Sequence, residues 1–155
     1  MNYDLEAEKF TMGGRNGVKA YVKSVYDGDT MKCIFGLPDI CDGRQFMWNC
    51  RLTGVDTPEI RGSGPREKQW AYRARDFVRD LVWKKEVFLD IEGEDKYGRL
   101  LVNAYVKDES DAETMLNLSM ELISGNWAVP YLGSGDKARW EEMPFPWEDE
   151  SLSSG

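Results

Sequence analysis

Histidine is absent from this sequence of 155 residues. Its absence excludes Ser-His-Asp and Cys-His nucleophiles, and it excludes acid-base catalysis by a pair of histidines. Any chemistry that the chain performs must therefore use carboxylates, Arg, Lys, Tyr or a metal ion.

Cysteine is scarce, and the three residues present, Cys33, Cys41 and Cys50, form no CxxC pair. An odd number at these spacings argues against a disulfide framework. Together with the lack of histidine, it also argues against a structural zinc site. We interpret all three as free thiols in a reducing compartment.

Long apolar runs are also missing, since no segment approaches the roughly 18 apolar residues of a membrane span. The first ten residues contain acids and no apolar run, which is unlike a secretory signal. We therefore expect no membrane partner and a cytoplasmic or otherwise intracellular location, with a processed secreted form as the alternative.

Positive charge is in deficit, because 20 Lys and Arg residues face 28 Asp and Glu residues, giving a net charge of −8. A protein that binds a polyanion usually presents a basic surface. One segment reverses the balance: from Arg61 to Lys85, eight basic residues face three acids, a local balance of +5. Here Arg66 and Lys68 could guide a phosphate backbone, whereas we interpret Arg75 and Arg79 as the solvated side of a helix.

Alternating apolar residues predict strands at 18–25, 30–35, 46–53, 87–91 and 100–106. In the third strand the alternation puts Arg51 on the face opposite Trp48 and Leu52. Turn residues at 27–29 and 95–98 join the first two and the last two strands into hairpins.

Helical spacing follows Gly64-Pro65, and Trp70, Phe77 and Trp83 are expected to pack inward. The segment 110–113 matches a capping box, which predicts a second helix that Gly125 ends, and a short third helical turn is expected at 136–142.

This order of elements is typical of a small closed barrel with one end plugged by a helix, an α+β and mainly β fold. We divide the chain into a lead-in at 1–17, one domain at 18–142 and an acidic irregular tail at 143–155. Trp140 and Trp147 would either contact a protein partner or fold back onto the barrel. A monomer is expected.

Three polar clusters stand at the predicted strand ends, at 27–30, 51–59 and 95–99. Each alone is ordinary turn chemistry. Together they provide what phosphodiester hydrolysis without histidine requires. Asp29 and Asp56 offer hard oxygen ligands for calcium or magnesium, a further carboxylate can position water, and guanidinium groups can neutralise charge on a phosphate.

These clusters, in this order, resemble the motifs of the staphylococcal nuclease (thermonuclease-like) family over about 18–131. The resemblance implies a five-stranded OB-fold barrel with two to three helices and calcium, Ca2+, as cofactor. It further implies endonucleolytic hydrolysis of DNA and RNA that leaves 3′-phosphate ends. The alternative is a barrel of the same kind that binds nucleic acid or protein without catalysis.

The resemblance also assigns roles by position. Asp29 and Asp56 would bind calcium through carboxylates and Thr57 through its main-chain carbonyl. Asp27 would not bind the ion directly but would act on it through these ligands. Glu59 would be the general base or would orient the attacking water.

Phosphate and nucleotide contacts follow in the same way. Arg51 and Arg99 would clamp the phosphate in the transition state. Lys96 and Tyr97 would contact a terminal phosphate, and Tyr131 would pack on a nucleotide.

Overall fold

The computed structural model describes residues 7–62, 64–132 and 137–147. Its first two strands, β1 (Arg15–Asp27) and β2 (Thr30–Phe35), form the predicted hairpin, with Asp27 paired to Thr30 across the turn. Ordered pairing begins before Val18, because the N–H of Gly14 donates to the carbonyl of Ile91 over 2.8 Å. The end of the predicted lead-in thus belongs to the sheet.

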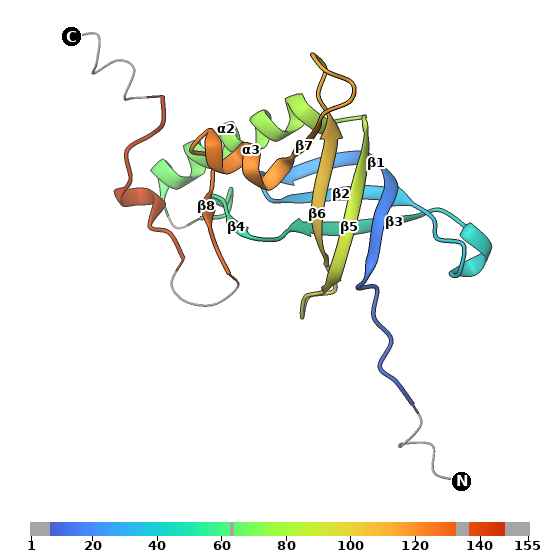
Figure 1. Cartoon of the computed structure of the whole chain (residues 1–155). Coiled ribbons are helices and arrows are strands. Elements are labelled where there is room, and N and C mark those ends of the chain that lie inside the picture. The colour runs from blue at the N-terminus through green and yellow to red at the C-terminus, as the bar shows by residue number, and fades with distance from the viewer. Residues whose placement is uncertain (1–6, 63, 133–136, 148–155) are drawn as a thin grey trace.

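Five strands close into a barrel, as predicted (Figure 1). The sheet order is β3-β2-β1-β5-β6-β7, and a parallel pairing of β3 with β6 joins Cys50 to Leu100 and closes the ring. The further strands are β3 (Phe46–Leu52), β5 (Glu86–Glu94) and β6 (Leu100–Lys107).

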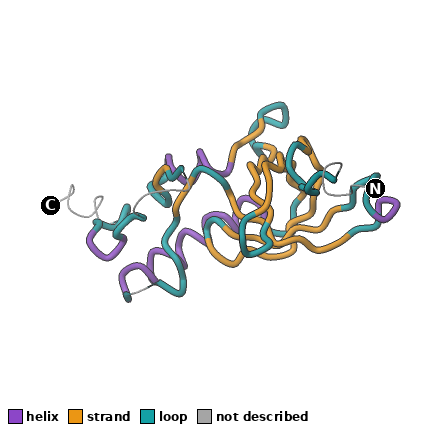
Figure 2. Tube along the Cα trace, turned by 90° about the horizontal axis from the view of Figure 1, so that it is seen from below, coloured by secondary structure: helices purple, strands orange, loops and turns teal. Residues whose placement is uncertain are grey.

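Helix α2 (Pro65–Val82) begins at the predicted proline and lies beside the barrel (Figures 1 and 2). Trp70 is buried and Phe77 packs on Trp127, as expected. The expectation for Trp83 was wrong: its side chain is 47% exposed, because the helix ends at Val82 and the chain turns outward. Neither helix among the described residues is long and apolar enough to span a membrane.

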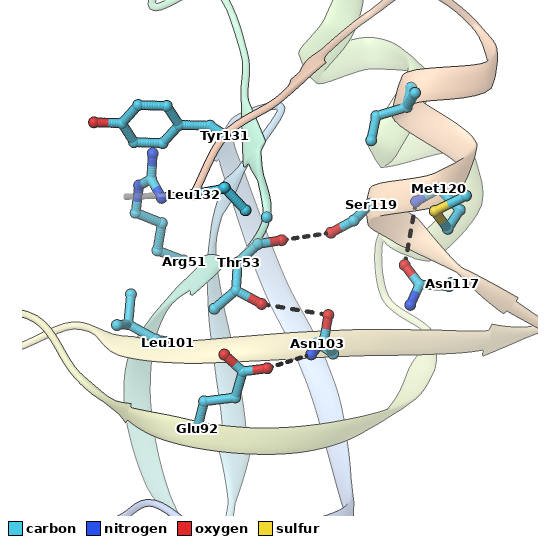
Figure 3. A pocket seen from close by; sticks show the side chains of 12 residues that line it. Arg51, Thr53, Glu92, Leu101, Asn103, Asn117, Ser119, Met120, Tyr131 and Leu132 are labelled. Atoms are coloured by element: carbon cyan, nitrogen blue, oxygen red, sulfur yellow. Dashed lines mark hydrogen bonds between the residues drawn. The ribbon is translucent and has the colours of Figure 1, made fainter. Parts of the chain in front are cut away.

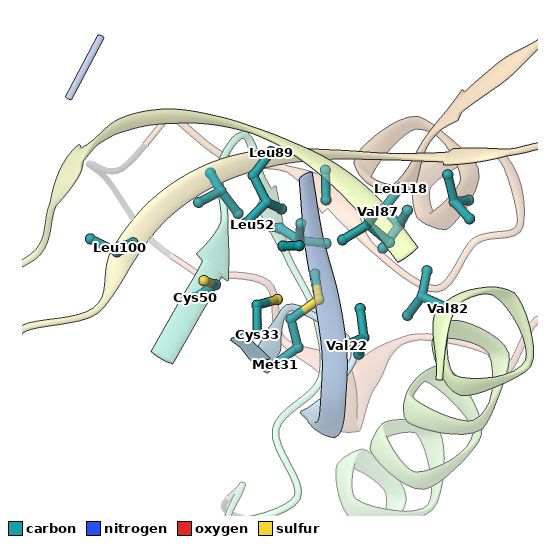
Figure 4. Close-up of a cluster of buried hydrophobic side chains, with 14 of the residues drawn as sticks. Val22, Met31, Cys33, Cys50, Leu52, Val82, Val87, Leu89, Leu100 and Leu118 are labelled. Carbon is teal, nitrogen blue, oxygen red and sulfur yellow. The ribbon is translucent and has the colours of Figure 1, made fainter. Parts of the chain in front are cut away.

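The core fills the barrel and extends to both helices (Figure 4). Val22 and Leu89 point inward from the strands, Val82 contributes from α2, and Leu118 from the second helix. Burying residues of this size stabilises the fold by about 1.5 to 3 kcal/mol each. This core fixes the strand ends on which the polar clusters stand.

The predicted start of the second helix was wrong. Residues 110–113 form a turn, Met115–Asn117 forms strand β7 against β6, and helix α3 spans only Leu118–Ser124. Its cap is Asn117, whose side chain accepts a hydrogen bond from the N–H of Met120 over 3.2 Å.

Short elements complete the fold, namely β4 (Val55–Asp56), β8 (Val129–Pro130) and the 3₁₀ turns η1 (Cys41–Gly43) and η2 (Trp140–Glu142). The described end of the chain, residues 137–147, lies against α2, and we call it the C-terminal strap. In the strap Trp140 packs edge-on against Trp70, with ring centroids 4.7 Å apart. Trp147 also packs edge-on against Trp70, with centroids 6.3 Å apart, so both tryptophans fold back onto α2, and the protein-partner alternative stays untested. Residues 136 and 148–155 lie outside the described part.

Candidate active site

The β1–β2 turn carries two buried acids, Asp27 and Asp29, which are 8% and 5% exposed. Gly28, between them, packs closely against neighbouring side chains. A Cβ atom there would lie 3.3 Å from side-chain carbons of both Ala74 and Thr57. The turn is therefore held between α2 and the segment after β4, and a larger residue would push the acids out of place.

Arg51 projects from β3 toward this turn. In the β2–β3 register it pairs with Thr30, and its Nη2 atom lies 3.4 Å from Oδ2 of Asp29. The N–H of Leu52 also donates to the main-chain oxygen of Asp29 over 2.8 Å. The pairing of β2 with β3 thereby fixes one guanidinium beside one carboxylate, and both side chains are largely buried.

The pairing of β4 with β8 positions the next two site residues. Asp56 pairs with Val129, and Thr57 is the residue that follows. Both residues are buried, whereas Glu59 is exposed. The hydroxyl oxygen of Thr57 is buried without a hydrogen-bond partner among the described residues. These three residues line a pocket of about 300 Å³.

The acids of the site lie close enough to change one another's pKa values. Burial, followed by the charges of Asp29 and Glu59, raises the pKa of Asp27 from 3.8 to about 6. Burial also raises the pKa of Asp56, and the charges of Asp29 and Glu59 act in the same direction. A cation among these carboxylates would relieve both effects.

The residues present fit a hard divalent cation in their chemistry. Asp29 and Asp56 supply carboxylate oxygens, and Thr57 supplies a main-chain carbonyl and a buried hydroxyl. Within the described ranges no three acidic or cysteine side chains form a group that could hold a metal ion by themselves. A bound cation would therefore take its other ligands from water or substrate.

The strap contributes two contacts that sequence reasoning missed. The N–H of Ala138 donates to Oδ2 of Asp56 over 3.2 Å, and Nζ of Lys137 lies 3.4 Å from Oε1 of Glu59. No local pattern signals these contacts, since the partners are separated by 82 and 78 positions.

Arg99 stands apart from the acids. Its Nε atom donates to Asp95 over 2.6 Å, and its guanidinium carbon lies 5.6 Å from the ring centroid of Tyr97. Lys96 lies over the same ring at 5.2 Å. In the β3–β6 register Arg51 pairs with Leu101, and Arg99 stands two residues earlier, just before β6 begins. No contact within the described chain joins Arg99 to the acids.

Arg51 and Tyr131 line a larger pocket of about 560 Å³ between the barrel and α3 (Figure 3). Its floor is a polar network that sequence reasoning also missed. Asn103 donates to Glu92 over 2.7 Å and accepts from Thr53 over 3.3 Å. Polar residues at outward positions of neighbouring strands were the sequence signal that could have predicted this network. Of the predicted residues, Asp56, Thr57 and Glu59 line the acidic pocket, whereas Arg51 and Tyr131 line the larger pocket. The others, Asp27, Asp29, Lys96, Tyr97 and Arg99, line neither of these two pockets.

A family model described as "Staphylococcal nuclease homologue" matches residues 49–134, more than half of the chain. The match includes Arg51, Asp56, Glu59 and Arg99, whereas the β1–β2 turn precedes it.

An uncharacterized protein of Methanocaldococcus jannaschii is 27% identical over 129 residues, covering 70% of this chain and 61% of the relative. A probable endonuclease of Aspergillus flavus is 28% identical over 93 residues, covering 58% and 34%. A probable endonuclease of Phaeosphaeria nodorum is 32% identical over 62 residues, covering 40% and 21%. The chain thus spans less than two thirds of these relatives. Barrel, polar clusters and family match agree: the chain belongs to the staphylococcal nuclease family.

Proposed function

We propose that this chain is a calcium-dependent endonuclease that hydrolyses phosphodiester bonds of DNA and RNA and leaves 3′-phosphate ends. The observation that carries the proposal is the largely buried pair of Arg51 and Asp29, 3.4 Å apart, beside the acids Asp56 and Glu59. The family match and the probable endonucleases among the relatives support the same reaction class.

In this proposal calcium bound by Asp29, Asp56 and the Thr57 carbonyl supplies positive charge at the phosphate. Glu59 accepts a proton from the water that attacks phosphorus. The P–O5′ bond breaks, and the departing O5′ oxygen takes a proton from solvent, so the phosphate stays on the 3′ side.

Arg51 and Arg99 donate hydrogen bonds to the phosphate oxygens, whose negative charge grows in the transition state. Arg51 is already placed by Asp29. Arg99 has to leave Asp95 or reach past it, and the exposed Tyr97 and Lys96 beside it can contact a flanking phosphate. Tyr131 lines the larger pocket, where a nucleotide fits by size.

Cleavage of plasmid DNA and RNA by wild type and by Glu59→Gln tests the proposal. We expect cleavage in calcium, none in EDTA, and at least a 100-fold lower rate for Glu59→Gln. Glu113→Gln removes an exposed acid away from the site and should cut at the wild-type rate. Wild-type rates in Glu59→Gln would contradict the proposed base. Binding without any cleavage would favour the non-catalytic alternative.

A further inference from the structure

Helix α2 carries a row of cations and aromatic rings along one side. The row, which we call the α2 stripe, has intervals of four, three, four and four residues. It consists of Lys68, Tyr72, Arg75, Arg79 and Trp83. At 3.6 residues per turn, these intervals place all five within about 80° of arc. The stripe lies beside the buried side of the helix and does not include it.

Contacts within the stripe join each ring to a cation. The guanidinium carbon of Arg75 lies 4.8 Å from the ring centroid of Tyr72, and that of Arg79 lies 5.9 Å from Trp83. Lys84 adds a second cation 4.7 Å from Trp83. The rings nevertheless remain 38% and 47% exposed. Partly exposed aromatic side chains next to cations are the composition of a base-stacking surface.

Lys68, Tyr72 and Trp83 are the exposed part of the stripe. Arg75 and Arg79 are half-buried, and Arg75 pairs with Asp76 over 3.0 Å. The C-terminal strap contacts the other edge of α2, where Arg66 lies over Phe145 and Arg73 over Trp147. Arg79 makes no ion pair within the described residues, and its Nε atom is buried without a hydrogen-bond partner there. A phosphate would therefore not have to displace a carboxylate of the described residues from Arg79.

The stripe meets the candidate active site at its middle. Arg75 is close enough for its charge to lower the pKa of Asp27, opposing the effect of burial. From Arg75 the stripe continues about 12 Å along the helix to Trp83. That length equals about four stacked nucleotides at 3.4 Å each.

We propose that the α2 stripe binds a single-stranded stretch of the polynucleotide substrate that flanks the scissile bond. Arg79 contacts phosphates, and the rings of Tyr72 and Trp83 stack on bases. A duplex hides the faces of its bases, whereas a single strand exposes them. With a net charge of −8, most of the surface repels a polyanion, so a local cationic row decides where the strand lies. This inference rests on the proposed function.

Binding can be measured without cleavage. In EDTA, fluorescence anisotropy of a labelled 20-nucleotide single-stranded DNA should show at least tenfold weaker binding for the double variant Arg79→Gln/Trp83→Ala. Arg79→Gln alone should flatten the slope of log affinity against log salt by about 0.7, the value for one phosphate contact on a single strand. Lys107→Gln, which removes an exposed charge outside the stripe, should bind like wild type.

Affinities of the double variant within twofold of wild type would overturn the inference, as would an equal loss for Lys107→Gln. Polyglutamate, a polyanion without bases, should compete poorly, and competition equal to that of DNA would overturn the stacking role.

Cleavage in calcium separates this inference from the proposed function. The double variant should raise KM at least tenfold for the 20-nucleotide substrate and leave kcat and trinucleotide cleavage unchanged. Equal effects on both lengths would overturn the stripe. If wild type cleaves neither substrate, the proposed function fails, while the binding experiment still judges the stripe.

Discussion

The Nζ atom of Lys137 lies 3.4 Å from the Oε1 atom of Glu59, although 78 positions separate the two residues. Both side chains are about half exposed, at 52% and 51%. An ion pair so open to water contributes about 0 to 1 kcal/mol, so substrate or a cation can displace it at little cost. The strap therefore places the positive charge of Lys137 next to Glu59, in an ion pair that is easily broken.

Lys137→Met should strengthen calcium binding by about two- to fivefold at low salt, because one competing cation is removed. The free energy of unfolding should change by less than about 1 kcal/mol. Calorimetric titration and urea unfolding check the two quantities. The same gain in Lys107→Met, whose charge is far along β6, would show that only net charge matters.

Trp140→Ala should lower the free energy of unfolding by about 3 to 5 kcal/mol, because the ring is buried against Trp70 and Phe145. Trp83→Ala, at an exposed ring, should cost less than about 1 kcal/mol. Chemical denaturation of both variants decides the point. Equal costs would mean that the strap does not stabilise the fold.

Local sequence patterns predicted the elements whose causes are local. In β3, Arg51 alternates with Cys50 and Leu52, and burial follows that alternation. Proline at the start of α2 and the turn residues 95–98 mark boundaries that the structure keeps.

The second helix shows where local patterns mislead. Side chains of Asp108 and Asp111 accept hydrogen bonds from the N–H groups of Ser110 and Glu113, which makes turns rather than a capping box. Pairing with β6 then draws Met115–Asn117 into a strand. Tertiary pairing overrode a plausible helix start.

The site residues, too, differ in how far local patterns could predict their positions. Asp29 stands in the predicted β1–β2 turn, and Arg51 stands on β3, which pairs with β2, so short-range strand patterns could bring them together. Lys137 and Ala138 act through partners distant in sequence, and nothing in one sequence places them. Asn103 stands at an outward position of a predicted strand, so its contact with Glu92 on the neighbouring strand had a signal.

Asp27→Asn should stabilise the protein in EDTA near neutral pH. Because folding raises the pKa of Asp27 from 3.8 to about 6, the native state holds its proton more tightly than the unfolded state. The contribution of Asp27 to wild-type stability should therefore fall as pH rises from about 4 to about 6. The variant should gain about 1 to 3 kcal/mol at pH 7 and nothing near pH 4. Denaturant unfolding across this range measures the difference.

Asp80→Asn, at an exposed acid on α2, is the matched control and should show no such pH-dependent gain. A gain for Asp27→Asn that is the same at pH 4 and pH 7 would exclude charge burial as its cause.

Arg51→Lys should reduce kcat about 100-fold, because an ammonium group cannot donate two parallel hydrogen bonds to a phosphate. A positive charge stays beside Asp29, so the free energy of unfolding should change by less than about 2 kcal/mol. Arg44→Lys, in an exposed loop, should keep full activity. Single-turnover cleavage with saturating enzyme measures the step, and an unchanged rate would remove Arg51 from the proposed transition state.

The most direct measurement is cleavage of one end-labelled single-stranded oligonucleotide by the wild-type protein across a calcium titration, with EDTA as the zero point. The account predicts internal cuts that appear and saturate with calcium and that end in 3′-phosphate. No cleavage at any calcium concentration, or equal cleavage in EDTA, would contradict it.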